Sequence, residues 1–221
     1  MHLIVRIANF VPPKEGGTFT FMSDSIFNPS HQENDISSKI VAGLERISEA
    51  FKVLLWEKAK SLGLSPIQIQ ILIFIKYHKL EFCSVSHLAK EFNVTKPTIS
   101  DAVRVLLKKE LIKKVFSSSD SRSYAIQLSD TGKGIVSETE NFATPLQSQL
   151  DNLNNDDLEQ TFNTLSQLIF KLNKIGVLTV QRTCYACKFY QKNDTQHYCN
   201  LLEKKLQNSE IRIDCPEFIE S

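Results

Sequence analysis

The centre of the chain carries two helical patterns of unequal length, separated by a tight turn. Residues 84–92 bring apolar side chains to one face at spacings of three and four, which predicts a short amphipathic helix. Asn93 and Val94 form the turn, and Thr95 is the N-cap expected of a longer helix that begins at Lys96. We expect this second helix to pack its apolar side inward and to leave its polar side exposed. Such a pair of helices constrains the chain to a helix-turn-helix.

A β-hairpin is expected directly after the second helix. Residues 111–116 are predicted to form one strand, and residues 124–128 alternate between apolar and polar side chains, which is typical of another. The polar loop between them contains Asp120 and Arg122. A helix-turn-helix followed by a hairpin is a winged helix-turn-helix, a DNA-binding architecture. The fold class is therefore predicted to be mainly α with a small β-hairpin wing.

Amphipathic helices are expected on both sides of this unit. Residues 36–62 carry an apolar stripe that predicts a long helix, and Gly63 is its expected end. Ser65 is the predicted N-cap of a second, largely apolar helix. Residues 156–176 predict another amphipathic helix, which ends at Gly176.

These patterns resemble the MarR-type transcriptional regulators over residues 36–175. The helix-turn-helix carries the resemblance in residues 88–100 and 106–112. In the wing, Asp120-Ser121-Arg122 followed by Leu128-Ser129-Asp130-Thr131-Gly132 is similar to the family pattern D-x-R…L-[ST]-x-x-G.

The chain departs from the family pattern at Glu110, where the family usually has glycine. A residue other than glycine in a left-handed helix cap costs about 1 kcal/mol. We therefore expect the second helix of the pair to end differently here.

The resemblance implies that the second helix enters the major groove of double-stranded operator DNA and that the wing reaches the adjacent minor groove. The candidate DNA-binding residues are Thr95, Lys96, Thr98, Asp101, Arg104, Lys108, Asp120 and Arg122. Asp101 is expected either to accept a hydrogen bond from a cytosine amino group or to orient Arg104. Arg122 is expected to respond to charge and groove width, held by an ion pair with Asp120. The alternative is a winged helix that is only a protein-interaction scaffold and binds no DNA.

The resemblance also implies a homodimer in which the outer helices of two subunits interleave. Residues 36–62 and 156–176 are suited to that role, although their apolar stripes would equally suit packing within one chain. A dimer would place two recognition helices about one DNA turn apart and predicts a palindromic operator. Members of the family often bind small phenolic or lipophilic effectors, and nothing in this sequence identifies one.

The charge distribution is consistent with a polyanionic partner. The chain has 26 Lys and Arg against 25 Asp and Glu, but residues 36–134 alone carry a net charge of +7. Such a basic region favours a nucleic-acid surface, although an ordinary solvated helix face is the simpler explanation. Only 7 residues are glycine, and no phosphate-loop, dinucleotide, zinc-protease or hydrolase motif occurs, so we expect no enzyme.

Four cysteines fall within the last forty residues as Cys184-x2-Cys187-x11-Cys199-x15-Cys215-Pro. In a reducing compartment two disulfides are not expected, and four thiolates converging on a metal are the natural alternative. The spacing is similar to that of high-potential-type [4Fe–4S] proteins, so a [4Fe–4S] cluster is favoured, with Zn²⁺ and then free thiols as alternatives. His197 is an alternative ligand, expected instead beside the site or at the surface. Cys83 is expected in the core.

This four-cysteine module suggests a regulator that responds to redox, oxygen or iron status. It would otherwise be a structural clip, or the protein would be an electron-transfer component. Three parts of the chain are expected. Residues 1–35 are a disordered tail or a mis-assigned one, and in the second case translation starts at Met22. A MarR-like domain follows over residues 36–176, with its DNA-reading part at 84–128, and the four-cysteine module covers residues 177–221. No apolar run is long enough for a transmembrane helix and the start is a poor secretory signal, so we expect a cytoplasmic protein.

Overall fold

The computed structural model describes residues 25–116, 124–193 and 196–221. The chain divides into two compact units, Met1–Ser48 and Glu49–Ser221. The first unit holds α1 (Pro29–Gln32) and the start of α2 (Ile36–Ser61), where Asp35 accepts hydrogen bonds from the main-chain N–H groups of Ser37 and Ser38. The expected disordered tail, residues 1–35, thus contains a helical turn near its end, whereas Met22 lies outside the described residues.

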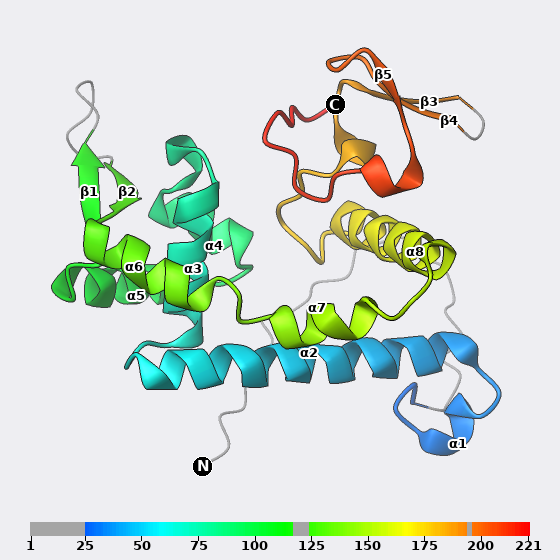
Figure 1. Cartoon of the computed structure of the whole chain (residues 1–221), viewed down its shortest axis with the longest axis horizontal. Helices are drawn as coiled ribbons and strands as arrows, with labels where there is room; N and C mark the ends of the chain where they lie inside the picture. Colours follow the sequence, from blue (N-terminus) through cyan, green and yellow to red (C-terminus); the bar gives the residue numbers. More distant parts are fainter. Residues whose placement is uncertain (1–24, 117–123, 194–195) are drawn as a thin grey trace, which may run out of the picture. The chain divides into compact units, whose positions relative to one another are not determined.

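The second unit contains a winged helix-turn-helix (Figure 1). Its elements are α3 (Pro66–Tyr77), the short 3-10 helix η1 (Leu80–Phe82), α4 (Val85–Glu91), α5 (Lys96–Lys108), β1 (Ile112–Phe116), β2 (Tyr124–Leu128) and α6 (Asp130–Thr139). Strands β1 and β2 pair antiparallel, from Ile112 opposite Leu128 to Phe116 opposite Tyr124. Then α7 (Thr144–Leu150) and α8 (Asn155–Lys174) follow along the chain. The predicted helix-turn-helix and hairpin are confirmed.

Local signals explain where these helices begin and end. The side chains of Ser84, Thr95 and Ser129 each accept a main-chain hydrogen bond at the start of α4, α5 and α6. Such caps satisfy amide groups that the first turn of a helix leaves unpaired. Gly63 and Gly176 have φ values of +60° and +78°, so the glycines expected to end α2 and α8 do take the left-handed conformation.

The core of the winged helix is apolar and contains residues from every helix and strand around it. The following side chains are completely buried: Ile69, Ile71, Leu72, Leu88, Ile99, Leu106, Ile126 and Val136. Cys83 is also completely buried, as expected, and burial raises the pKa of its thiol to about 11. Its main-chain carbonyl accepts a hydrogen bond of 2.7 Å from the N–H of Ile126, which ties the segment before α4 to the wing.

The start of α6 packs unusually close to the end of α5. The Ser129 hydroxyl donates to the Glu110 carbonyl over 2.6 Å, and the Ser129 N–H donates to the Leu111 carbonyl over 3.0 Å. A Cβ atom on Gly132 would lie 1.9 Å from that Leu111 oxygen, so only glycine fits. Packing thereby explains Ser129 and Gly132 in the Leu-Ser-Asp-Thr-Gly pattern, whereas Asp130 and Thr131 are exposed.

The prediction that α5 ends differently because of Glu110 is wrong. Glu110 has a φ of +57° and therefore takes the left-handed conformation that glycine would take. The N–H of Leu111 donates to the carbonyl of Leu106, and the N–H of Glu110 donates to that of Leu107. These bonds close the helix in the usual Schellman pattern, and the contacts with Ser129 hold the strained residue in place.

Residues 177–221, which we call the C-terminal domain, lie within the second unit and contain more β-structure than the sequence suggested. The domain consists of η2 (Cys184–Ala186), β3 (Tyr190–Asn193), β4 (Gln196–Cys199), β5 (Lys204–Leu206) and η3 (Asn208–Glu210), and its three strands form one antiparallel sheet in the order β3-β4-β5. Cys184, Leu206 and Ile211 are buried together, with Phe162 of α8 packed against them. None of the helices among the described residues is both long and apolar enough to cross a membrane.

Candidate nucleic-acid interface and cysteine pocket

The polar face of α5 is exposed because its apolar face is buried. Ile99, Ala102, Val103 and Leu106 face the core. The candidate residues Thr95, Lys96, Thr98, Asp101, Arg104 and Lys108 are all exposed. The structure therefore leaves all six side chains accessible to an approaching ligand along the second helix and at its N-cap.

Neighbouring side chains on this face are already paired with each other. The hydroxyl groups of Thr95 and Thr98 lie 2.9 Å apart, within hydrogen-bond distance. Arg104 donates a hydrogen bond from Nη2 to Oδ1 of Asp101, and both side chains are largely exposed. This pair is consistent with Asp101 orienting Arg104, and both roles expected for Asp101 stay predictions.

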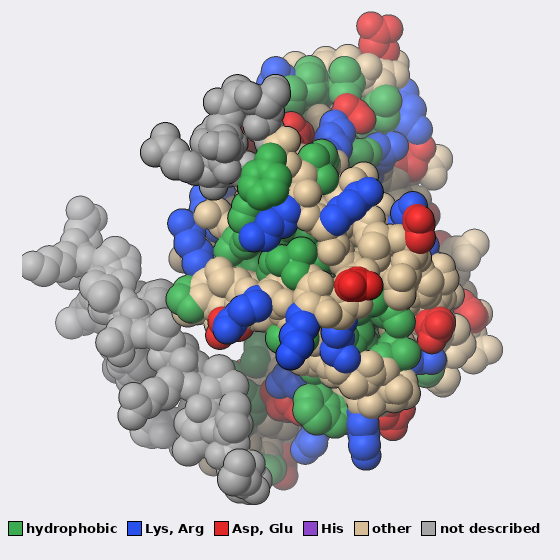
Figure 2. Space-filling view, turned by 90° about the vertical axis from the view of Figure 1, so that its left-hand side faces the viewer, with side chains coloured by type: hydrophobic (Ala, Val, Ile, Leu, Met, Phe, Trp, Pro, Cys, Tyr) green, Lys and Arg blue, Asp and Glu red, His purple; other side chains and the backbone are tan. Residues whose placement is uncertain are grey.

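The wing adds cations that the sequence prediction omits. Lys113 and Lys114 are exposed on β1, and the Lys114 ammonium lies 4.3 Å from the centre of the Tyr124 ring on β2. Their position in the strand after the second helix was the available signal. Figure 2 shows Lys and Arg side chains spread over the side of the molecule on which α5 and β1 lie. Asp120 and Arg122 lie outside the described residues.

An ionic cluster joins the helix-turn-helix to the C-terminal domain. Arg182 donates from Nη1 and Nη2 to the two carboxylate oxygens of Glu91 on α4, over 2.8 and 2.9 Å, and from Nε to Asp214 over 2.5 Å. The second oxygen of Asp214 lies 2.8 Å from Nε2 of His78. We call these four residues the Arg182 cluster. No motif in the sequence indicated it.

Burial and pairing oppose each other within the Arg182 cluster. Burial alone would raise the pKa of Asp214, but hydrogen bonds from Arg182 and His78 outweigh it, and the pKa lies below its usual value. Burial would likewise lower the pKa of Arg182, but hydrogen bonds to Glu91 and Asp214 raise it instead. The charged forms are thus the stable ones, as expected for a buried arginine with two carboxylate partners.

Two further hydrogen bonds join the same parts of the chain. The side chain of Asn93 in the turn donates to the carbonyl of Val177 over 3.2 Å, and the Thr179 hydroxyl donates to the carbonyl of Lys90 over 2.5 Å. The turn between α4 and α5 is therefore in direct contact with the segment that leads into the C-terminal domain.

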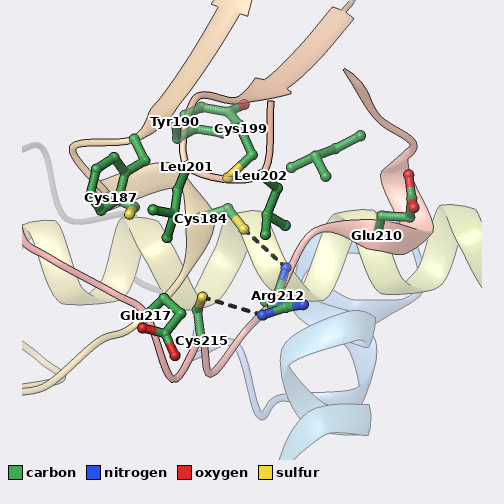
Figure 3. Close-up of a pocket in the computed structure, with 12 residues that line it drawn as sticks. Cys184, Cys187, Tyr190, Cys199, Leu201, Leu202, Glu210, Arg212, Cys215 and Glu217 are labelled. Atoms are coloured by element: carbon green, nitrogen blue, oxygen red, sulfur yellow. Dashed lines mark hydrogen bonds between the residues drawn. The ribbon is translucent and has the colours of Figure 1, made fainter. Parts of the chain in front are cut away.

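The four C-terminal cysteines line one pocket (Figure 3). Cys184 and Cys187 come from η2 and the residue after it, Cys199 from the end of β4, and Cys215 from the segment after η3. The other lining residues are mostly apolar: Phe189, Tyr190, Leu201, Leu202 and Leu206, with Glu210, Arg212 and Glu217. All four cysteines are free of disulfides, and burial raises the pKa of the Cys184 thiol.

Arg212 donates hydrogen bonds to two of these sulfur atoms. Its main-chain N–H donates to Sγ of Cys184 over 3.2 Å, and its guanidinium donates to Sγ of Cys215 over 3.7 Å (Figure 3). His197, the alternative ligand, is buried, and its ring nitrogens lie 2.5 Å from the Tyr190 hydroxyl and 3.1 Å from the Asn208 side chain. It is therefore a buried structural residue outside the pocket lining.

The geometry does not by itself form a site for a single metal ion. Within residues 25–116, 124–193 and 196–221, no group of three or more His, Cys, Asp or Glu side chains is arranged to hold one ion. The expected cofactor at these cysteines, [4Fe–4S] or Zn²⁺, stays a prediction.

Comparison with known proteins identifies the fold. Residues 62–123 match the sequence model of the MarR family. Among solved structures, the chain is similar to Staphylococcus aureus MepR in a DNA complex, with 24% identity and a TM-score of 0.53 over 60% of this chain and 97% of MepR. It is also similar to a MarR transcriptional regulator from Methanosarcina mazei Go1, with 17% identity and a TM-score of 0.53 over 62% of this chain and 97% of that one.

A third similar structure is the transcriptional regulator PA3341, with 19% identity and a TM-score of 0.54 over 61% of this chain and 98% of that one. No curated protein sequence matches the chain significantly. These likenesses support the MarR-type winged-helix fold. The alignments cover almost all of each matched structure but only 60% to 62% of this chain. The remaining residues of this chain therefore have no counterpart in these structures.

Proposed function

We propose that this protein is a homodimeric, sequence-specific DNA-binding transcription regulator of the MarR type. The observation that carries the proposal is the α5 face, on which six polar residues are exposed opposite a fully apolar buried face. An α-helix fits the major groove, where base edges present distinct hydrogen-bonding patterns. MepR, which shares the fold, has been seen in complex with DNA, which supports the proposal.

The exposed residues divide by the contacts they are suited to make. Lys96, Lys108 and the wing residues Lys113 and Lys114 are cations for phosphate contacts, which position the protein without reading sequence. Thr98 and Arg104 are suited to base edges, and Asp101 orients Arg104. At the wing tip, Asp120 and Arg122 are the proposed minor-groove pair.

The dimer is proposed with a second copy of this chain along α2. Large apolar side chains of that helix are exposed in the single chain: Ile36, Ile40, Val41, Ile47, Phe51, Val53 and Trp56. Exposed apolar side chains in such numbers on one helix are typical of an interface. The amphipathic pattern of α8 is consistent with the same role, and a twofold dimer would require a palindromic operator.

The proposal is tested by selecting bound fragments from random genomic DNA with the full-length protein and measuring affinity for the selected site. The expected result is a palindromic site whose affinity falls steeply with salt, with a log–log slope of about −0.9 for each phosphate neutralised. Failure to select any site, or a slope near zero, would support the protein-interaction scaffold instead. Sedimentation of the free protein tests the dimer separately.

We also propose that the C-terminal domain makes DNA binding responsive to redox, oxygen or iron status. The specific support is the Arg182 cluster together with the Asn93 contact, because both touch the helix-turn-helix next to α5. A change in the C-terminal domain that moved Arg182 would alter the support of α4 and of the turn before α5. A structural clip would instead leave operator affinity unaffected by the state of the cysteines.

A further inference from the structure

We propose that the pocket formed by Cys184, Cys187, Cys199 and Cys215 binds a [4Fe–4S] cluster. Figure 3 shows the four sulfur atoms facing the same space, although their residues come from separate segments of the C-terminal domain. Thiolates are the ligands that iron–sulfur clusters require.

The spacing of the four cysteines, Cys184-x2-Cys187-x11-Cys199-x15-Cys215-Pro, favours a cluster over a single ion. Zinc binds thiolates at about 2.3 Å in a tetrahedron, which places the sulfur atoms about 4 Å apart. A cubane cluster holds its four terminal thiolates at the corners of a larger tetrahedron. Four cysteines that line one pocket supply the four terminal thiolates that such a cluster needs.

The walls of the pocket suit a cluster as well. Leu201, Leu202, Leu206 and Phe189 provide an apolar lining, of which Leu206 is buried and Leu201 and Leu202 are exposed. The two lining carboxylates are held elsewhere: Glu210 lies 2.6 Å from the ammonium of Lys204, and Glu217 lies 3.8 Å from that of Lys79. The cysteines are therefore the natural ligands in the pocket.

The charge balance of the bound cluster is accommodated by Arg212. Each thiol loses its proton when its sulfur binds an iron atom of a preformed [4Fe–4S]²⁺ core, so four protons leave and the bound site carries a net charge of 2−. The main-chain N–H and the guanidinium of Arg212 already point to the sulfur atoms of Cys184 and Cys215. Hydrogen bonds to cluster sulfur atoms stabilise the negative charge and tune the reduction potential.

The ligands lie next to the residues that contact the helix-turn-helix. Asp214 directly precedes Cys215, and Arg182 lies two residues before Cys184. The Cys215 N–H also donates a hydrogen bond to the Arg182 carbonyl over 3.0 Å. A cluster that fixes Cys184 and Cys215 would therefore fix both Arg182 and Asp214. This consequence rests on the proposed regulation of DNA binding, whereas the cluster itself does not.

The test begins with the unmodified full-length protein, purified without oxygen from iron-replete cells. We expect a brown protein with about four iron and four acid-labile sulfide per chain and a Mössbauer spectrum typical of [4Fe–4S]²⁺. Colourless protein that contains about one zinc per chain, or protein with neither metal, would overturn the proposal.

Two variants sharpen the test. Cys199→Ser should lose the cluster, whereas Cys83→Ser, which changes a cysteine buried in the winged-helix core, should retain it. Circular dichroism of Cys199→Ser shows whether the winged helix stays folded. Retention of the full iron and sulfide content by Cys199→Ser would contradict the assignment of that ligand.

DNA binding is then measured with and without the cluster. A changed affinity links the cluster to regulation. A cluster that binds without altering DNA affinity would support the cofactor assignment and contradict the proposed regulation of DNA binding. Absence of DNA binding in both forms would defeat the proposed function while leaving the cofactor assignment standing.

Discussion

Arg182 holds both carboxylate oxygens of Glu91, at 2.8 and 2.9 Å, and thereby joins the C-terminal domain to the first helix of the helix-turn-helix. The arginine side chain is only 9% exposed and its Nε also donates to Asp214. The planar guanidinium matches a carboxylate in this two-bond geometry, which an ammonium group cannot reproduce. The contact between these two parts of the chain therefore depends strongly on one side chain.

Replacing Arg182 should destabilise the protein. Arg182→Met leaves Glu91 and Asp214 without the guanidinium that pairs with both. We expect the unfolding free energy to fall by about 2 to 3 kcal/mol. The loss is smaller than for a fully buried pair because the Asp214 side chain is half exposed and water screens its charge. Urea denaturation measures the loss. The control is Lys79→Met, whose exposed pair with Glu217 should contribute less than about 1 kcal/mol. Equal effects of the two substitutions would contradict this role for Arg182.

Gly132→Ala should be strongly destabilising, although alanine is the better helix former. The new Cβ would lie 1.9 Å from the Leu111 carbonyl oxygen, so the start of α6 must move away from the end of α5. We expect a loss of about 3 kcal/mol. The matched control lies two residues away on the same helix: a Cβ on Gly134 meets no atom within 4 Å, and Gly134→Ala should stabilise by up to about 1 kcal/mol. Thermal unfolding of both variants decides the matter.

Glu110→Gly should stabilise the protein by about 1 kcal/mol. Glu110 has a φ of +57°, a conformation that glycine adopts without strain. Lys108→Gly, within the last turn of α5, should have the opposite sign, since glycine weakens a helix interior. Chemical denaturation measures both. If Glu110→Gly were destabilising, the glutamate side chain would have to contribute more than the strain it carries.

His87 should make the protein less stable at acidic pH. Burial lowers its pKa below 6.5, an effect that Arg182, Lys90 and His78 reinforce and Glu91 opposes, and its Nε2 is buried without a hydrogen-bond partner among the described residues. A lowered pKa means that the unfolded chain binds the proton more readily than the folded protein. The unfolding free energy should therefore fall as the pH drops through 6.5.

The test substitution for that pH dependence is His87→Phe, because His87 stacks on Phe82 with ring centroids 4.9 Å apart. Phenylalanine retains the stacking and removes the titrating group. Denaturation curves across the pH range should show a weaker pH dependence for the variant. An unchanged dependence would assign the effect to another group.

The two arginines of the proposed interface should differ in their effects on DNA binding. Arg104→Ala should alter base preference, with about 1 to 3 kcal/mol lost at the preferred base pair. Arg122→Ala should weaken binding to all sequences about equally and lower the salt slope by about one unit. Lys205→Ala, an exposed cation on β5, is the matched control and should leave affinity unchanged. Competition binding with substituted operators measures these effects.

Local interactions explain what could be predicted. The exposed face of α5 follows from the spacing of Ile99, Ala102, Val103 and Leu106, since burying one side of a helix necessarily exposes the other. Helix starts at Ser84 and Thr95 depend on hydrogen bonds within three residues. The order of helix, turn, helix and hairpin could therefore be predicted from sequence, as could the exposure of the candidate residues of α5.

Contacts between distant residues decided the rest. The sheet β3-β4-β5 consists of strands of three or four residues, too short to show an alternating pattern. Glu110 retains the left-handed cap because Ser129, nineteen residues later, bonds its carbonyl. The partner of Arg182 lies 91 residues away, and no local pattern indicates such a pair. The sequence alone determined the spacing of the four cysteines and the helix that presents Arg104. Only the tertiary structure decided that the cysteines share a pocket and that the C-terminal domain contacts α4. Both depend on packing between segments that lie far apart in the chain.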